Sequence, residues 1–263
     1  MGRKWTAWIT AGMLLLGLAV LLYPAVSSAV NRHHGSYAIQ QFRKQLEEMD
    51  TVQLDAELEE ARAYNQQLQH AAVPDEERYN QILDFGNGMI GYITIEKLDL
   101  MLPIYHGVGT EVLEKGVGHL PSSAFPIGGS GNHTVLTGHT GLPSAKLFTD
   151  LTELLIGDRF QVNVGTHSVE YQVDQILVVL PQETEGLMPA AGRDYCTLVT
   201  CTPYGVNSHR LLVRGNRVKA TEEITLDIEN VPEPEKGNCS LWLFLVPVVP
   251  VLLIWKRKRG KNG

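Results

Sequence analysis

The feature that most constrains this chain is a run of residues, 5–30, that contains no charged side chain. As a helix rising about 1.5 Å per residue, it is long enough to cross a hydrocarbon layer about 30 Å thick. Arg3 and Lys4 precede it, so we expect a cytoplasmic tail over residues 1–4 and a transmembrane helix over residues 5–30. The alternative is a cleaved signal peptide, because residues 26–29 are small. Both interpretations export the middle of the chain.

A second uncharged run covers residues 241–255 and is followed by a basic tail over residues 256–263. It is short and contains two prolines, which membrane helices tolerate. Because basic flanks stay inside the cell, we expect a second transmembrane helix and two cytoplasmic termini. The middle of the chain would then lie on the extracellular face of the cell membrane. Residues 221–240 are acidic and proline-containing, and we interpret them as a spacer.

Charge and cysteine content exclude several classes of function. Without the seven cations of the two tails, 15 Lys and Arg face 29 Asp and Glu, a balance of about −14, which argues against a nucleic-acid partner. No His/Cys cluster has metal-ligand spacing, so we expect neither a metal nor another cofactor. Cys196 and Cys201 are five residues apart in one expected strand and point to opposite faces, so they cannot form a disulfide. Cys239 is interpreted as incidental.

The pattern of apolar residues in the middle of the chain changes near residue 91. Residues 36–70 have apolar side chains at helical spacing and predict one or two amphipathic helices, with a loop from residue 71, so that 31–90 form an N-terminal segment. Residues 91–220 contain short β-branched runs separated by turn residues, which predict an eight-stranded, mainly β barrel with brief helices such as 144–154. The expected strands are 92–95, 101–105, 134–137, 160–164, 169–172, 175–180, 197–201 and 210–214.

Three residues in this region have the chemistry of an acyl-transfer site. Cys201 ends an apolar β-run before a proline-containing turn, a rigid and accessible place for a nucleophile. His139 follows another β-run and is flanked by glycines, as a strand-end base would be. Arg210 follows Cys201 by nine residues across a hairpin-like loop, which returns it beside the cysteine, where a guanidinium could stabilise an oxyanion. Each residue taken alone also has an ordinary structural interpretation.

Longer motifs around these residues point to one family. Residues 197–215 read TLVTCTPYGVNSHRLLVRG and closely resemble the signature of class C, or pilin-polymerising, sortases of Gram-positive bacteria. The segments 91–107, 116–120 and 138–150 resemble the same family in the same order. The resemblance is dense over residues 79–217 and looser for the two-span layout.

The resemblance implies that Cys201, His139 and Arg210 form a catalytic trio on a sortase-type barrel. Cys201 would attack the Thr–Gly bond of an LPXTG-type sorting signal, His139 would protonate the leaving amine, and a pilin lysine would resolve the thioacyl enzyme. The implied partners are pilins or surface proteins with such signals. Thr200 and Ser208 are candidates for lining the substrate groove.

One segment departs from the family pattern. Class C sortases usually carry a lid with an Asp-Pro-aromatic anchor, whereas residues 73–77 read VPDEE. We expect a weakly held lid that includes Pro74 and Asp75, with Asp75 as a substitute partner for Arg210. Three other functions remain open: a sortase that attaches proteins to a peptidoglycan precursor, an inactive membrane-tethered β-barrel adhesin or scaffold, and a hydrolytic cysteine protease.

Overall fold

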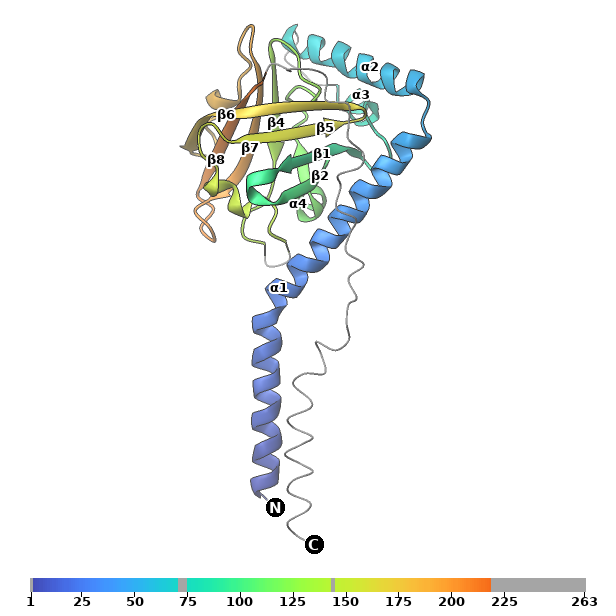
Figure 1. Ribbon diagram of the computed structural model, residues 1–263. Helices are drawn as coiled ribbons and strands as arrows, with labels where there is room; N and C mark the ends of the chain where they lie inside the picture. The colour runs from blue at the N-terminus through green and yellow to red at the C-terminus, as the bar shows by residue number, and fades with distance from the viewer. Residues whose placement is uncertain (1, 71–74, 143–144, 219–263) are drawn as a thin grey trace. The chain divides into compact units, whose positions relative to one another are not determined.

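The computed structural model describes residues 2–70, 75–142 and 145–218. Pro74, Cys239, the acidic spacer, the second expected span and the basic tail lie outside the described residues. Eight strands close into a barrel in the order β1-β2-β3-β4-β7-β8-β6-β5 (Figure 1), which confirms the predicted mainly β class. The strands are β1 (Met89–Ile95), β2 (Leu100–His106), β3 (Val117–His119), β4 (Asn132–Thr137), β5 (Arg159–Val164), β6 (His167–Val179), β7 (Asp194–Thr202) and β8 (His209–Arg217).

The predicted number of strands is correct, but the division differs. Two predicted strands, 169–172 and 175–180, form the single strand β6, whose register against β8 shifts between Val173 and Gln175. The irregularity breaks the alternation of side chains without ending the strand. Strand β3 is not among the predicted strands, because a three-residue strand with a central glycine carries almost no periodic signal. In place of the expected helix over 144–154, the described residues form the short 3₁₀ helix η2 (Thr149–Glu153).

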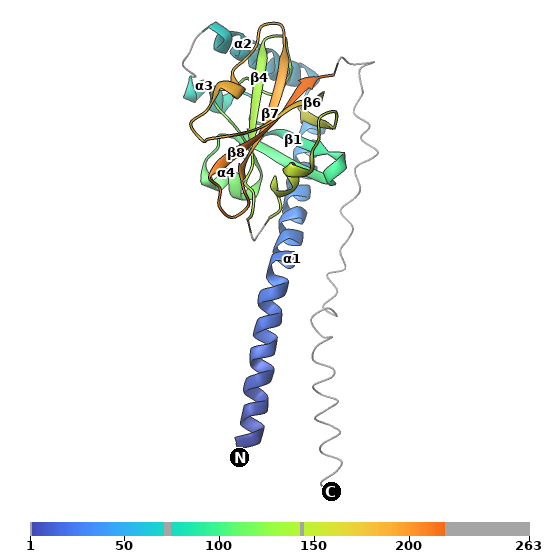
Figure 2. The same ribbon diagram turned by 90° about the vertical axis from the view of Figure 1, so that its left-hand side faces the viewer.

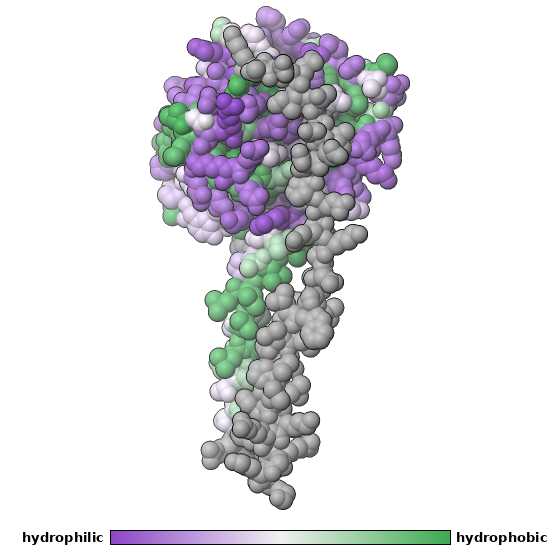
Figure 3. Space-filling view, viewed as in Figure 1, coloured by the Kyte–Doolittle hydropathy of each residue, from purple (hydrophilic) through white to green (hydrophobic). Residues whose placement is uncertain are grey.

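The expected span and the first amphipathic helix are one continuous helix, α1 (Gly2–Glu48). Its first half exposes large apolar side chains (Figure 3), whereas Ile39 and Phe42 in its second half are buried in the core of the barrel unit. Arg43 donates a hydrogen bond of 2.8 Å to the Tyr92 hydroxyl of β1. Within the described part of the chain, α1 is the one helix long and apolar enough to cross a membrane.

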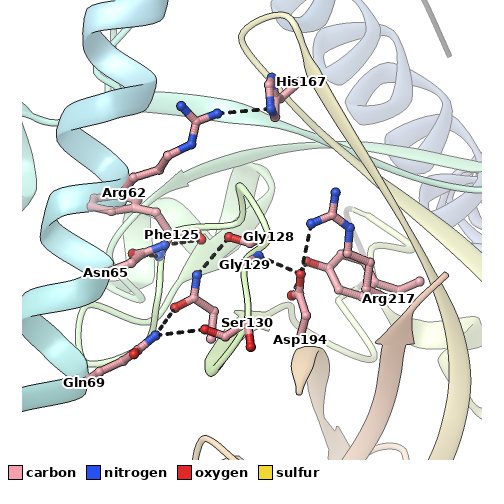
Figure 4. A network of polar contacts seen from close by, with 12 residues as sticks. Arg62, Asn65, Gln69, Phe125, Gly128, Gly129, Ser130, His167, Asp194 and Arg217 are labelled. Atoms are coloured by element: carbon pink, nitrogen blue, oxygen red, sulfur yellow. Dashed lines mark hydrogen bonds and ion pairs between the residues drawn. The ribbon is translucent and has the colours of Figure 1, made fainter. Parts of the chain in front are cut away.

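The second predicted helix is α2 (Thr51–His70), which docks at one end of the barrel. Its Asn65 exchanges two hydrogen bonds with the Phe125 main chain, at 3.1 and 2.7 Å, and its Gln69 donates to Asn132 Oδ1 at 2.8 Å. Asn132 begins β4, and Asp194, which begins β7, accepts a 2.6 Å bond from Gly129 beside it (Figure 4). Helix α2 therefore covers the end at which β4 and β7 begin. The opposite ends of these strands are left for the candidate site.

A short helix that the sequence analysis did not predict, α3 (Glu76–Gln81), inserts Tyr79 into the core. The Tyr79 hydroxyl lies 3.0 Å from His119 Nδ1, and His119 Nε2 lies 2.9 Å from the carbonyl oxygen of Ala124. These contacts fit a neutral imidazole that donates from Nε2 and accepts at Nδ1. Burial lowers the pKa of His119 to about 4 because the charged form would lose its hydration. His119 is therefore a core residue.

We expect His119 to make the fold less stable as the pH falls. The unfolded chain binds a proton near pH 6.5, but the folded chain does so only near pH 4, so the free energy of unfolding decreases between these values by about 3 kcal/mol. Below pH 4 this residue adds no further loss. Urea unfolding at pH values from 7 to 4 measures the decrease, and a His119→Gln variant should lose this part of the slope. Parallel pH curves for the two proteins would contradict the assignment.

Candidate active site

The hairpin of β7 and β8 places Arg210 directly opposite Cys201. The two residues are register partners in the antiparallel pair, followed by Thr202 and His209 at the end of the ladder. Side chains of directly opposed residues project from the same face of a sheet. The strand pairing therefore confirms the predicted position of Arg210 beside Cys201.

His139 reaches the same edge through a parallel pairing of β4 with β7. Thr137 is the register partner of Val199. His139 lies two residues after Thr137, and Cys201 lies two residues after Val199. Strands β4 and β7 lie side by side in Figure 2. Gly138 N donates to Val199 O at 3.0 Å, which extends the contact past the strand end. Phe148 N donates to His139 O at 3.0 Å. The main chain of His139 is thus held from both sides at the level of Cys201.

The two glycines that flank His139 serve different purposes. Gly141 has φ +73°, a left-handed conformation that favours glycine, and the Tyr204 ring of the β7–β8 loop lies against it. Gly138 instead permits a close approach, because a Cβ there would lie 2.6 Å from the buried Phe148 ring. The loop that carries His139 and the loop that carries Tyr204 are therefore in contact.

Thr200 holds the His139 segment and does not line an open groove as expected. Thr200 is 2% exposed, and its hydroxyl donates a 2.7 Å hydrogen bond to Gly138 O. The reason is strand alternation: Thr200 points away from the face that carries Cys201. Ser208, the other residue expected in the groove, is exposed, and its hydroxyl lies 2.8 Å from His209 Nδ1.

We expect a Thr200→Val substitution to lower the free energy of unfolding by about 1–3 kcal/mol, because it keeps the shape but leaves the buried Gly138 carbonyl without its donor. Chemical denaturation of the purified protein measures the change. Thr200→Ser, which keeps the hydroxyl, is the matched control and should lose clearly less stability. Equal losses in both variants would mean that packing of the methyl group, not the hydrogen bond, explains the effect.

Cys201 lies on the outer face of the barrel, next to a small apolar cluster formed by Val135, Val199 and Leu212. Partly buried side chains pack on this outer cluster from the segments around it: Leu120, Leu177, Val179 and Leu187. The inner face of β7 carries Cys196 and Leu198, which belong to the main core. The outer cluster was not predicted, although apolar residues on both faces of β7 indicate that both faces are covered.

The two described cysteines are both free, as predicted, and lie in opposite environments. Cys196 is fully buried, and burial raises the pKa of its thiol well above the ordinary value because a thiolate would lose its hydration. Cys201 is partly exposed at the strand end. Since the thiolate is the reactive form, Cys201 is the thiol with access to a substrate and Cys196 is an inert core residue.

The expected pairing of Asp75 with Arg210 is wrong in this structure. Asp75 caps α3, and its carboxylate accepts a 3.1 Å hydrogen bond from Arg78 N. Arg210 donates instead to the carbonyl oxygens of Asn207 and His209, at 3.3 and 3.1 Å. An acid at the cap followed by Glu76 and Glu77 is a helix-start signal that the sequence analysis overlooked.

Among the described residues, no group of three or more His, Cys, Asp or Glu side chains could hold a metal ion. The site consists of a partly exposed thiol, a guanidinium opposite it and an imidazole-bearing segment fixed at the same level. Such a set suits nucleophilic attack on a carbonyl, with a proton carrier and a cation for the developing oxyanion.

Comparisons with known proteins agree with this chemistry. The family model of the Sortase domain matches residues 93–218. The crystal structure of sortase C1 from Streptococcus agalactiae is 42% identical, with a TM-score of 0.67, and the match covers 70% of this chain and 99% of that one. A structure of sortase C1 of GBS Pilus Island 1 is 40% identical, with a TM-score of 0.67, over 72% of this chain and 94% of that one.

A curated relative is more distant. Sortase A of Bacillus anthracis is 30% identical over 130 residues, which are 49% of this chain. The chain spans about 60% of the length of that relative.

Proposed function

Because this chain belongs to the sortase family, we propose that it is a membrane-tethered cysteine transpeptidase that cleaves an LPXTG-type sorting signal between Thr and Gly. It joins the threonine carboxyl to an amine, in the first place a pilin lysine. The observation that carries the proposal is the convergence of Cys201, Arg210 and the His139 segment at one strand edge. The choice of a pilin lysine is supported by the similarity to the sortase C1 of a pilus island.

In this mechanism the Cys201 thiolate attacks the threonine carbonyl carbon, and the developing oxyanion is stabilised by Arg210. His139 carries the proton to the glycine amine as the peptide bond breaks, which leaves a thioester between Cys201 and threonine. The incoming amine then attacks the thioester, gives up its proton to His139 and releases Cys201. The fixed main chain on both sides of His139 supports this role, because a proton carrier must keep its geometry through both steps.

The outer cluster of Val135, Val199 and Leu212 supports binding of the apolar part of the signal. It lies on the same face of the sheet as Cys201 and begins two register pairs away, at Val199 and Leu212. The apolar surface would bury the leucine and proline of LPXTG while the threonine carbonyl reaches the thiol.

The proposed topology has both termini in the cytoplasm and the barrel on the extracellular face of the membrane. Its support is the exposed apolar half of α1 and the basic residues that flank the two uncharged runs. This arrangement would keep the site near membrane-anchored substrates.

The test is to incubate the full chain in detergent micelles with an LPXTG peptide and to measure the intact mass. A mass increase equal to the peptide up to threonine supports the thioacyl step. Binding of the peptide without an adduct would favour an inactive adhesin or scaffold instead. With a pilin lysine peptide and a peptidoglycan-type amine both present, the amine found in the product distinguishes pilus assembly from cell-wall attachment. Hydrolysed peptide as the sole product would indicate a cysteine protease.

A further inference from the structure

A cleft lies where α1 leaves its exposed apolar half and meets the barrel. Its lining comes from four places: α1 between residues 28 and 35, residues 98–102 at η1 (Glu96–Leu98) and the start of β2, Lys115 at the end of α4 (Thr110–Lys115), and the segment between residues 145 and 150. None of these residues belongs to the Cys201 site or to the outer cluster. The proposed transpeptidase activity does not involve the cleft.

The cleft is lined by more basic than acidic side chains, although the chain as a whole is acidic. Arg32, Lys115 and Lys146 line it together with Asp99 and Asp150, whereas the whole chain carries a net charge of −7. Lys146 and Asp150 neutralise each other at 2.7 Å. Lys115 Nζ lies 4.4 Å from the centre of an aromatic ring, a contact that keeps its charge. Two cations thus face one remaining acid.

Arg32 is the cation whose position most needs an explanation. It is exposed, and it forms no hydrogen bond or ion pair with any residue in the described ranges. It follows the uncharged run 5–30 by two residues on the same continuous helix. A run of that length spans about 39 Å as a helix, somewhat more than a hydrocarbon layer of about 30 Å, so Arg32 belongs at the level of the lipid headgroups.

The helix and the barrel are held together at this level. A Cβ on Gly35 would lie 3.6 Å from the Pro103 ring of β2, so the two elements are in close contact there. Apolar side chains of Leu98, Met101 and Leu102 line the cleft next to the charged ones. The cleft therefore combines cations at headgroup depth with an apolar wall.

We propose that the cleft binds an anionic phospholipid of the membrane leaflet next to the barrel, with Arg32 and Lys115 contacting the headgroup phosphate. The apolar wall contacts the glycerol and the first acyl carbons. Juxtamembrane basic residues attract anionic lipids by about 1 kcal/mol each near the surface. The bound lipid would fix the orientation of the barrel on the membrane. It would also support the 145–150 segment, in which Phe148 holds the His139 main chain.

The experiment uses the full chain in micelles that contain equal amounts of phosphatidylglycerol and phosphatidylcholine, and native mass spectrometry counts the retained lipids. We expect wild type to retain phosphatidylglycerol about tenfold over phosphatidylcholine. Arg32→Glu should reduce this preference to near unity. The matched control is Lys44→Glu, which reverses an exposed α1 cation that lies outside the cleft and should keep the preference.

Three outcomes would overturn the proposal. The first is a wild type without preference for phosphatidylglycerol. The second is an equal loss in the Arg32 and Lys44 variants, which would indicate general charge attraction. The third is complete displacement of the lipid by millimolar inorganic phosphate, which would identify a site for free phosphate. Both variants keep Cys201 and its neighbours, so thioacyl formation measured on the same samples tests the transpeptidase proposal separately.

Discussion

Replacement of Cys201 by alanine is expected to abolish thioacyl formation and to lower kcat/KM for transfer from an LPXTG peptide by at least about 10⁴-fold. The reason is that both steps of the proposed reaction pass through a bond to this sulfur, and no neighbouring side chain can replace it. Intact-mass measurement of the adduct and the rate of amine-linked product check the result. Since Cys201 is partly exposed at a strand end, the substitution should leave the free energy of unfolding nearly unchanged.

Cys196 provides the matched control on the same strand. It is fully buried, and burial raises the pKa of its thiol, so a Cys196→Ala variant should lose stability through a small cavity but keep its adduct. An adduct that persists in Cys201→Ala and disappears in Cys196→Ala would show that the wrong cysteine was assigned. Loss of activity in both variants with loss of folding only in the second would still support Cys201.

The sequence predicted the Cys201–Arg210 pairing because a hairpin is a local structure. Arg210 follows Cys201 by nine positions, the loop between them has turn composition, and antiparallel strands joined by such a loop pair in register. The position of His139 is different. It depends on β4 lying parallel to β7, a contact between segments about 60 residues apart that no local pattern specifies. The family resemblance, not the spacing, supplied that part of the site.

The incorrect predictions also reflect the short range of the sequence signals on which they were based. β6 was divided because its register irregularity at residues 173–175 interrupts the side-chain alternation that defines a strand in sequence. Asp75 was expected to pair with Arg210 because of the family's lid pattern, although its position before Glu76 and Glu77 fits an N-cap. Thr200 was placed in the groove by proximity to Cys201, but adjacent residues of a strand face opposite sides.

The β7–β8 hairpin has two faces, and these explain how it contributes both to the core of the barrel and to the candidate active site. Register partners Leu198 and Val213 belong to the main core, whereas the next pair, Val199 and Leu212, belongs to the outer cluster. Cys201 and Arg210 continue the outer row at its end. A change in either residue should therefore affect chemistry at the surface more than packing inside the barrel.

Replacement of Arg210 by alanine is accordingly expected to lower kcat/KM by about 10²–10³-fold, the cost of removing one group that stabilises an oxyanion. The loss should appear in the acylation rate, measured in a single turnover with an LPXTG peptide, because the charge on the carbonyl oxygen develops only in the transition state. Peptide binding should change far less. Arg214→Ala is the matched control: it removes an arginine of the same strand that pairs with Asp174 at 2.9 Å and should leave the acylation rate essentially unchanged.

A structural role for Arg210 predicts a different pattern. The guanidinium also donates to the carbonyl oxygens of Asn207 and His209, so the alanine variant would loosen the loop after Cys201 even if Arg210 took no part in the chemistry. Lysine can restore such bonds to carbonyl oxygens, but it lacks the planar fork that would bind an oxyanion. Arg210→Lys should therefore recover the stability of the wild type while its acylation rate stays well below that of the wild type. Full activity in that variant would assign Arg210 to holding the loop and would leave oxyanion stabilisation to other groups.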